Sequence, residues 1–193
     1  MKLFFYDLET TGLNPARNGV HQISGEIVIN GESMEKFDYK VQPNPKCIIE
    51  QAALDVGGLS KEIVLSYPTM EDVYYRLTKM LNKYVDKYNK KDKFFLTGYN
   101  NASFDDKFFR GFFLQNGDPY FGSWFWSTPI DVMVLATYKL SSKREDLENF
   151  KLSTVAKYIG IEVEDKALHD AYYDIYLTKA IYDAIGKDIN NNV

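Results

Sequence analysis

The chain has little of the two residue types that build thiolate and imidazole metal sites. It contains one cysteine, Cys47, and two histidines, His21 and His169, among 193 residues. One cysteine allows no internal disulfide and no cysteine-based zinc site, and two histidines exclude a histidine-rich metal site. Such a composition fits a reducing compartment, so we expect a cytoplasmic protein.

Long hydrophobic runs are also missing. The N-terminal apolar run, Leu3 to Tyr6, is closed by Asp7 and is too short for a signal peptide. No other stretch approaches the length of a membrane span, so no membrane partner is expected. The content of 45% hydrophobic and 16% aromatic residues predicts a packed globule. We expect one domain over residues 1–186, followed by a polar tail at 187–193.

Neither sign of charge dominates, since 27 acidic residues against 23 basic ones give a net charge of −4. This balance argues against a protein that coats nucleic acid through a wide basic surface. Residues 76–110 nevertheless carry nine Lys or Arg against four Asp or Glu. The lysines there are either a solvated helix face and its exit loop or a phosphate-facing surface. Trp124 and Trp126 offer a similar choice between core packing, which we favour, and base stacking.

The hydrophobic pattern predicts an α/β fold. Three strands, at 3–8, 22–29 and 35–41, form an antiparallel meander, with Asn30 and Gly31 as a hairpin turn. A helix capped by Thr69 leads to a strand at 94–99, and this crossover predicts a parallel, central strand. The segment at 48–65 is expected to be irregular with a helical turn, and 139–150 to be a polar loop. Further helices are predicted at 104–115, 130–139, 153–159 and 171–185.

Two carboxylates, Asp7 and Glu9, end the first strand. Residues two apart on a strand leave from the same face, so these like charges lie side by side. Either they belong to a solvated strand end, or they meet further carboxylates and bind Mg²⁺ or Mn²⁺.

Two other acids are placed to join this pair. Asp105 follows the predicted central strand, at a helix start near the carboxyl edge of the sheet. Asp174 lies in the last helix, five residues after His169, so the two share a site only if His169 precedes the helix. Asp170 is a good capping residue and permits this arrangement.

Three segments in this order resemble a known family. "FYDLETTGL" resembles the first motif of the DnaQ-like 3′ to 5′ exonucleases, "YNNASFD" the second, and "HDAYYD" the third in its histidine-containing DEDDh form. The resemblance runs from residue 3 to about residue 183, and the DEDDh branch includes the proofreading subunit of bacterial replicative polymerase. It implies a ribonuclease H-like fold, with a mixed sheet of an antiparallel meander and parallel strands flanked by helices.

The resemblance also implies roles for single residues. It assigns two Mg²⁺ or Mn²⁺ ions to four carboxylates, with His169 as the general base. The register of the second motif selects Asp105 over the adjacent Asp106, and Asn100 departs from the family by standing where a histidine is usual. The carboxylates are Asp7, Glu9, Asp105 and Asp174, and the expected substrate-binding residues are Thr10, Thr11, Gly12 and Asn101.

The function that this resemblance implies is a metal-dependent 3′ to 5′ exonuclease. We expect it to act on single-stranded DNA or frayed DNA 3′ ends, in proofreading or end trimming, with a DNA polymerase as a candidate partner. One alternative is an exoribonuclease of the same fold, of the oligoribonuclease or ribonuclease T type, so RNA remains a candidate substrate. Another is a binding subunit without catalysis, which the intact set of acids and His169 disfavours.

Overall fold

The centre of the molecule is a mixed five-stranded sheet with the order β3-β2-β1-β4-β5. The structure is a computed structural model that describes residues 1–164 and 170–190. β1 (Lys2–Thr10) pairs antiparallel with β2 (Val20–Ile29), which pairs antiparallel with β3 (Glu32–Lys40). β4 (Phe95–Gly98) is parallel to β1, and β5 (Ile130–Asp131) is parallel to β4. The predicted meander and the parallel strand after a crossover are both confirmed.

The β2–β3 hairpin turns at the residues that the sequence indicates. Asn30 and Gly31 both have positive φ, 52° and 89°. A tight two-residue hairpin turn needs this conformation, which asparagine and glycine adopt with little strain.

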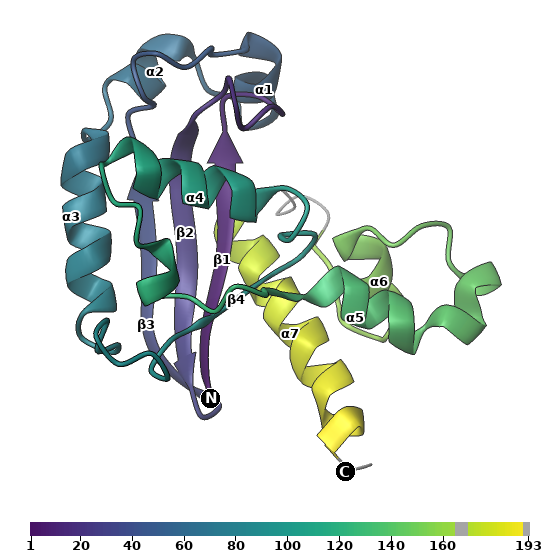
Figure 1. Ribbon diagram of the computed structural model, residues 1–193. Coiled ribbons are helices and arrows are strands. Elements are labelled where there is room, and N and C mark those ends of the chain that lie inside the picture. The colour runs from purple at the N-terminus through teal and green to yellow at the C-terminus, as the bar shows by residue number, and fades with distance from the viewer. Residues whose placement is uncertain (165–169, 191–193) are drawn as a thin grey trace.

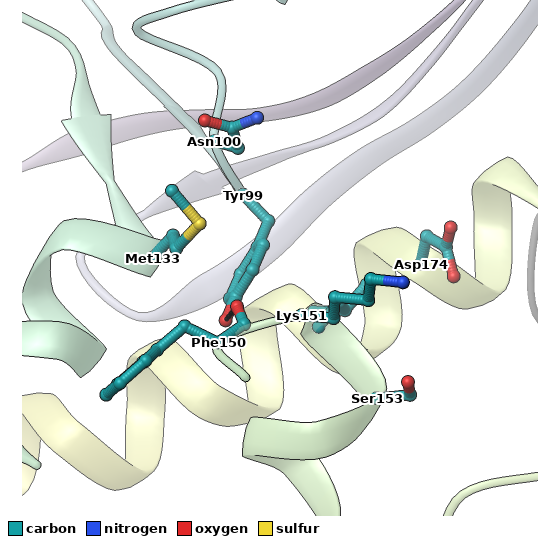
Figure 2. A pocket seen from close by; sticks show the side chains of 8 residues that line it. Tyr99, Asn100, Met133, Phe150, Lys151, Ser153 and Asp174 are labelled. Carbon is teal, nitrogen blue, oxygen red and sulfur yellow. Dashed lines mark hydrogen bonds between the residues drawn. The ribbon is translucent and has the colours of Figure 1, made fainter. Parts of the chain in front are cut away.

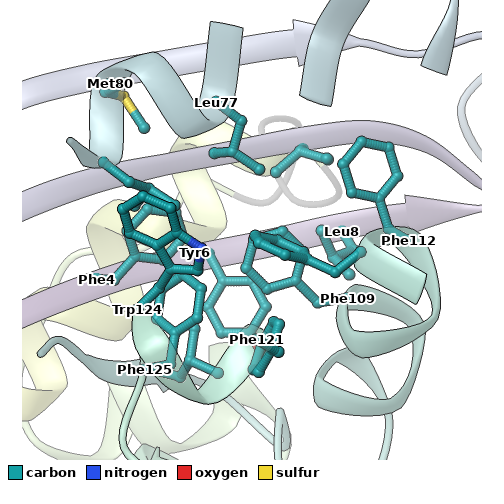
Figure 3. Packing of buried hydrophobic residues seen from close by; sticks show 14 of the residues in the cluster. Phe4, Tyr6, Leu8, Leu77, Met80, Phe109, Phe112, Phe121, Trp124 and Phe125 are labelled. Carbon is teal, nitrogen blue, oxygen red and sulfur yellow. The ribbon is translucent and has the colours of Figure 1, made fainter. Parts of the chain in front are cut away.

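One face of the sheet is covered by an aromatic core (Figure 3). The face is formed by alternate residues of β1, among them Phe4 and Tyr6, and is covered by α3 (Met70–Leu81), α4 (Asp105–Gln115) and the short 3₁₀ turn η1 (Phe121–Ser123). The Phe4 and Phe109 rings stack with centroids 5.9 Å apart. The aromatic side chains buried here are Phe4, Tyr6, Phe37, Phe94, Phe108, Phe109, Phe112, Phe113, Phe121, Trp124 and Phe125.

The other face is covered by α7 (Ala171–Asn190), which crosses the sheet behind β1 (Figure 1). Leu3 and Phe5 pack there against Ile175. α5 (Val132–Lys139) and α6 (Leu152–Tyr158) pack on α7 through a separate apolar cluster and form a lobe beside the sheet. The 3₁₀ segment η2 (Ser141–Asp146) joins them, in a stretch predicted to be a loop.

Several predicted elements differ from the structure in their bounds or content. Residues 48–65 contain two short helices, α1 (Gln51–Val56) and α2 (Lys61–Leu65), and α7 continues past the predicted end at 185. The helix predicted from 130 begins at Val132, because Ile130 pairs with Thr97 and Asp131 caps the helix by accepting the Met133 amide. No helix within residues 1–164 or 170–190 has both the length and the apolar character needed to cross a membrane.

Candidate active site

Asp7 and Glu9 lie at the carboxyl end of β1, on the face that α7 covers. Residues on a strand alternate between faces, and Phe5, two residues before Asp7, stacks edge-on against Tyr182 of α7. The same alternation directs Tyr6 and Leu8 into the aromatic core. One strand therefore presents acids on one side and core residues on the other.

Asp105, at the first turn of α4, reaches the same strand end. The pairing of β4 with β1 begins at Leu3 and ends at Phe5 of β1. The amide of Leu8 therefore has no partner in β4. The Leu8 amide donates instead to Asp105 Oδ1 at 3.3 Å. The short length of β4 thus makes room for a carboxylate that is 7% exposed.

Asp106 points elsewhere. Its Oδ2 accepts a hydrogen bond from Arg110 Nε at 2.8 Å, one helical turn along α4. The structure therefore places Asp105, and not Asp106, beside the Asp7 strand.

Asp174 comes from the first turn of α7. Asp170 caps this helix, because its Oδ1 accepts the Tyr173 amide at 3.1 Å, as its position in the sequence predicts. The predicted general base, His169, lies outside the residues that the structure describes.

Burial and neighbouring acids raise the pKa values of Asp7, Glu9 and Asp105. Burial raises the pKa of Asp7 well above its usual range, and the charges of Asp105, Glu9 and Asp174 raise it further. Burial is the main cause that raises the pKa of Glu9 to about 7, and the negative charge of Asp174 is the next. The positive charge of Lys40 opposes this shift. Burial also raises the pKa of Asp105. Burial is the largest cause of each shift, and the added effect of Glu9, Asp105 and Asp174 on Asp7 shows that acids from three elements lie near one another.

A divalent cation suits this set of donors. Four carboxylates supply the oxygen ligands that Mg²⁺ and Mn²⁺ prefer, and a cation between them would relieve their mutual repulsion. Among residues 1–164 and 170–190, however, no group of three or more His, Cys, Asp or Glu side chains is gathered tightly enough to hold an ion as placed. The chemistry of the donors fits a metal, and ligation requires them to draw closer.

A cavity of about 630 Å³ opens beside Asp174 (Figure 2). Aromatic and aliphatic side chains form much of its wall, and Lys151 extends toward Asp174 across it. The Tyr99 hydroxyl donates to the Phe150 carbonyl at 2.7 Å, which ties the end of β4 to the α6 segment. The lining residues are Tyr99, Asn100, Met133, Phe150, Lys151, Leu152, Ser153 and Asp174.

Asp131 positions the loop between β4 and α4, a role that the sequence analysis missed. Its carboxylate accepts the amides of Asn100 at 3.0 Å and Ala102 at 3.2 Å, besides capping α5. Asn100 has a φ of 59°, so a fixed anchor there stabilises an uncommon conformation. The helix-capping position of Asp131 before "VMVLATYK" was the signal that could have identified it.

Gly98 lets this loop approach β1. A Cβ at Gly98 would lie 2.9 Å from the Cβ of Asn101 and 3.1 Å from the carbonyl oxygen of Tyr6. Any side chain at this position would push the loop, and Asp105 behind it, away from the strand.

Two of the predicted substrate-binding residues lie in the interior of the protein. Thr11 is fully buried, its hydroxyl donates to the Ile48 carbonyl at 2.8 Å, and its amide donates to the Gly19 carbonyl at 2.9 Å. Asn101 is fully buried as well, close to the Tyr6 hydroxyl under the acids. Thr10 is partly exposed and Gly12 is buried, and a contact between either residue and a nucleotide stays a prediction.

The remaining candidates from the sequence are buried or partly buried. Trp124 is 2% exposed and belongs to the aromatic core, so the packing interpretation is confirmed, and Trp126 packs beside Phe95. His21 is buried in the wall of a small cavity that it shares with Glu9. Burial and the charge of Lys40 lower the pKa of His21 to about 4, so its ring is neutral at neutral pH.

A mixed sheet whose edge gathers acids from β1, α4 and α7 beside an open cavity is the arrangement of a nuclease. The chain matches the model of the RNase T exonuclease family over residues 4–182 and belongs to this family. It is therefore an exonuclease domain, and exonucleases of this family use divalent metal ions.

Curated relatives include DNA polymerase III of the PolC type. The protein from Oceanobacillus iheyensis is 26% identical over 97% of this chain, and that from Clostridium perfringens is 25% identical over 86%. The chain spans only 12% and 10% of the lengths of these two relatives.

Similar solved structures include exonuclease I of E. coli. The complex with a dT13 oligonucleotide has a TM-score of 0.72 and 25% identity, covering 95% of this chain and 40% of exonuclease I. A zinc-bound complex with single-stranded DNA has a TM-score of 0.75 and 25% identity, covering 97% and 40%. The match over nearly the whole of this chain confirms the predicted ribonuclease H-like sheet with flanking helices.

Proposed function

We propose that this chain is a metal-dependent 3′ to 5′ exonuclease that removes nucleotides from the 3′ ends of single-stranded or frayed DNA. The observation that carries the proposal is the meeting of Asp7, Glu9, Asp105 and Asp174 at one end of β1, where their charges raise the pKa of Asp7.

In this proposal the four acids would hold two Mg²⁺ or Mn²⁺ ions. Bound ions of this kind lower the pKa of a water and neutralise the charge that grows on the leaving 3′ oxygen. Asp7 has the most acid neighbours and would be the shared ligand, while Asp105 is oriented by the Leu8 amide. His169, whose ordinary pKa of about 6.5 suits proton transfer near neutral pH, would accept the proton of the attacking water.

The cavity beside Asp174 would hold the end of the strand. Its apolar walls, including Tyr99 and Phe150, suit a base or sugar, and Lys151 offers a charge for a phosphate near the acids. Binding of an anion next to four carboxylates needs such a cation, because their own field repels phosphate.

The comparisons support DNA as the substrate. The curated relatives are PolC-type DNA polymerases, and the two exonuclease I structures hold single-stranded DNA or an oligonucleotide. A DNA polymerase is accordingly the protein partner that we propose, because the matched region is a small part of the polymerase chains.

An end-labelled degradation assay tests the proposal. Single-stranded DNA, duplex DNA with a mismatched 3′ end, fully paired duplex and RNA are compared with Mg²⁺, Mn²⁺, Ca²⁺ or chelator. We expect stepwise loss of 3′ nucleotides with Mg²⁺ or Mn²⁺ and poor support by Ca²⁺, whose coordination is larger and looser. Mismatched ends should be trimmed faster than paired ends because they unstack at lower cost. Faster removal of 3′ nucleotides from RNA than from DNA would favour the exoribonuclease alternative. Activity in chelator would refute the metal mechanism.

A charge-neutral variant tests the cavity. Lys151→Gln should raise KM about tenfold, since loss of a charged contact costs about 1.5 to 3 kcal/mol and each 1.4 kcal/mol is tenfold. Lys143→Gln, at another exposed lysine in the same lobe, is the matched control. Equal kinetics of the two variants would exclude Lys151 from substrate binding.

A further inference from the structure

A second surface with aromatic and basic side chains lies at the end of the sheet opposite the acids. It consists of the loop after α3, residues 82–93, and the segment 118–124 that includes η1. Lys2, at the start of β1, hydrogen-bonds to the Tyr84 carbonyl and the Asp92 carboxylate, which fixes the loop at the N-terminal end of the strand (Figure 1). We call these two segments the Tyr88–Tyr120 surface. A cavity of about 400 Å³ in it is lined by Lys87, Tyr88, Asp118, Tyr120, Ser123 and Trp124.

Two tyrosines on this surface hold their rings in solvent. Tyr88 is 85% exposed and Tyr120 is 71% exposed, although both line the same cavity. Trp124 is 2% exposed and forms its floor. The Lys87 ammonium lies 5.4 Å from the Tyr88 ring centroid and 5.6 Å from that of Trp124. The cavity therefore combines open aromatic faces with a cation.

The acids of this surface are engaged within the protein. Asp118 accepts the Tyr74 hydroxyl at 2.5 Å and the Tyr120 amide at 2.7 Å. Asp86 accepts the Tyr88 amide at 3.0 Å, and Asp92 pairs with Lys2. Each of these acids is fixed by contacts within the protein and not by an ion pair with Lys87, Lys90 or Lys91.

Several of the lysines, by contrast, have no acid partner. Lys87, Lys90 and Lys91 are exposed, and no acid among the residues that the structure describes lies within ion-pair distance of them. Lys83, in comparison, pairs with Glu35 at 2.9 Å. The surface thus carries unmatched positive charge in a chain of net charge −4.

We propose that the Tyr88–Tyr120 surface binds single-stranded nucleic acid away from the acids, holding a part of the substrate strand that lies outside the cleft. Proteins that bind single strands combine aromatic platforms for bases with cations that follow the phosphates, and this surface offers both. The proposal rests on the proposed function, because the strand that is bound here is the substrate of the other site. An acidic peptide would pair with the lysines but leave the open ring faces without a use.

The position of this surface makes its effect depend on strand length. Lys2 and Asp7 are five residues apart on β1, which is roughly 17 Å at about 3.3 Å per residue. The surface also adjoins the aromatic face, through Trp124, whereas Asp7 faces α7. A strand that engages both the acids and this surface must therefore be longer than one that is held at the acids alone.

Binding of fluorescent oligo-dT to the full chain, measured by anisotropy in chelator, tests the proposal without hydrolysis. Strands of about 4 and about 16 nucleotides cover the usual range of single-strand site sizes. We expect Tyr88→Ala with Tyr120→Ala to weaken binding of the long strand at least tenfold and to weaken binding of the short strand less, because only the long strand engages both sites. Tyr88→Phe with Tyr120→Phe should restore it, since the rings remain. Tyr75→Ala, at a tyrosine of α3 that is 65% exposed, is the matched control.

The lysines are tested through salt. The triple variant Lys87→Gln, Lys90→Gln, Lys91→Gln removes three cations. Each phosphate contact on a single strand contributes about 0.7 to the slope of log affinity against log salt, so the magnitude of the slope should fall by about 2. Poly-glutamate is the competing probe for an acidic partner.

Several outcomes would overturn the proposal. They are unchanged binding of the long strand to the tyrosine variant, equal weakening of both strands, an unchanged salt slope, or poly-glutamate binding as tight as oligo-dT. The exonuclease proposal fails in a different way. In that case the chain still binds long strands more tightly than short ones in chelator, but it degrades neither when Mg²⁺ or Mn²⁺ is added.

Discussion

The two faces of β1 are built from adjacent residues and have opposite character. Phe4, Tyr6 and Leu8 enter a core of stacked and edge-on rings, while Asp7 and Glu9, between and beyond them, face other acids. On the first face the packed aromatic side chains stabilise one another in the buried state. On the second, burial and like charge oppose the ionised state of each acid.

This difference separates stability from activity within one strand. The aromatic face fixes the backbone of β1 and α4, and so fixes where Asp7 and Asp105 lie. The acidic face costs stability in the absence of a cation, since its acids would be less strained if they were neutral or farther apart. Variants on the two faces should therefore have opposite effects.

The largest effect is expected at Asp7. Asp7→Asn keeps the shape of the side chain but removes the charge that has three acid neighbours. We predict a loss of several orders of magnitude in turnover with Mg²⁺ and a rise in the Tm of the metal-free protein. Glu148→Gln, at an exposed acid, is the control for both measurements. A lower Tm in Asp7→Asn would mean that the carboxylate is structural.

The reverse pattern is expected at Phe109 on the aromatic face. It is fully buried and contacts the rings of Phe4, Tyr6 and Phe113. Phe109→Ala should lower the free energy of unfolding by about 3 to 5 kcal/mol in urea titrations. Turnover per folded molecule, measured at low temperature, should change little. Leu114→Ala, at an exposed residue of the same helix, should be nearly neutral in both.

A third prediction concerns the pH dependence of stability in chelator. The folded-state pKa of Glu9 is about 7 and that of Asp7 is also raised, whereas both are near 4 in the unfolded chain. The folded state thus binds more protons between these values, and stability falls as pH rises from about 4 through 7. Urea titrations at pH 5 and pH 8 measure the fall, which should be smaller in Asp7→Asn. A stability that increases over this interval would show that the acids do not oppose one another.

The sequence predicts most of the aromatic face and less of the acidic one. Alternation and helical spacing identify β1 to β4 and the long helices, because burial dictates those patterns. Asp7, Glu9, Asp105 and Asp174 were identified through the motifs, and in the structure the other three acids lie near enough to Asp7 for their charges to raise its pKa. The two residues of β5, Ile130 and Asp131, and the anchoring of the β4–α4 loop by Asp131, carry no periodic signal. The cavity between α5, α6 and α7 depends on how separate helices dock, which no local pattern specifies.

The smallest effect should occur one residue away from a large one. Asp105 and Asp106 are adjacent acids in the first turn of α4. Asp105 accepts a hydrogen bond from the Leu8 amide, whereas Asp106 pairs with Arg110. Asp105→Asn should reduce turnover by orders of magnitude, as Asp7→Asn does, because both alter the same set of donors. Asp106→Asn alters a partly exposed pair, so we expect less than about 1 kcal/mol in unfolding free energy and less than about twofold in turnover. Both variants keep the side-chain shape and the helix position, so the comparison isolates which acid faces the substrate. If Asp106→Asn were the inactive variant, the second motif would have to be read one residue later, and the contact between Asp105 and β1 would then be structural.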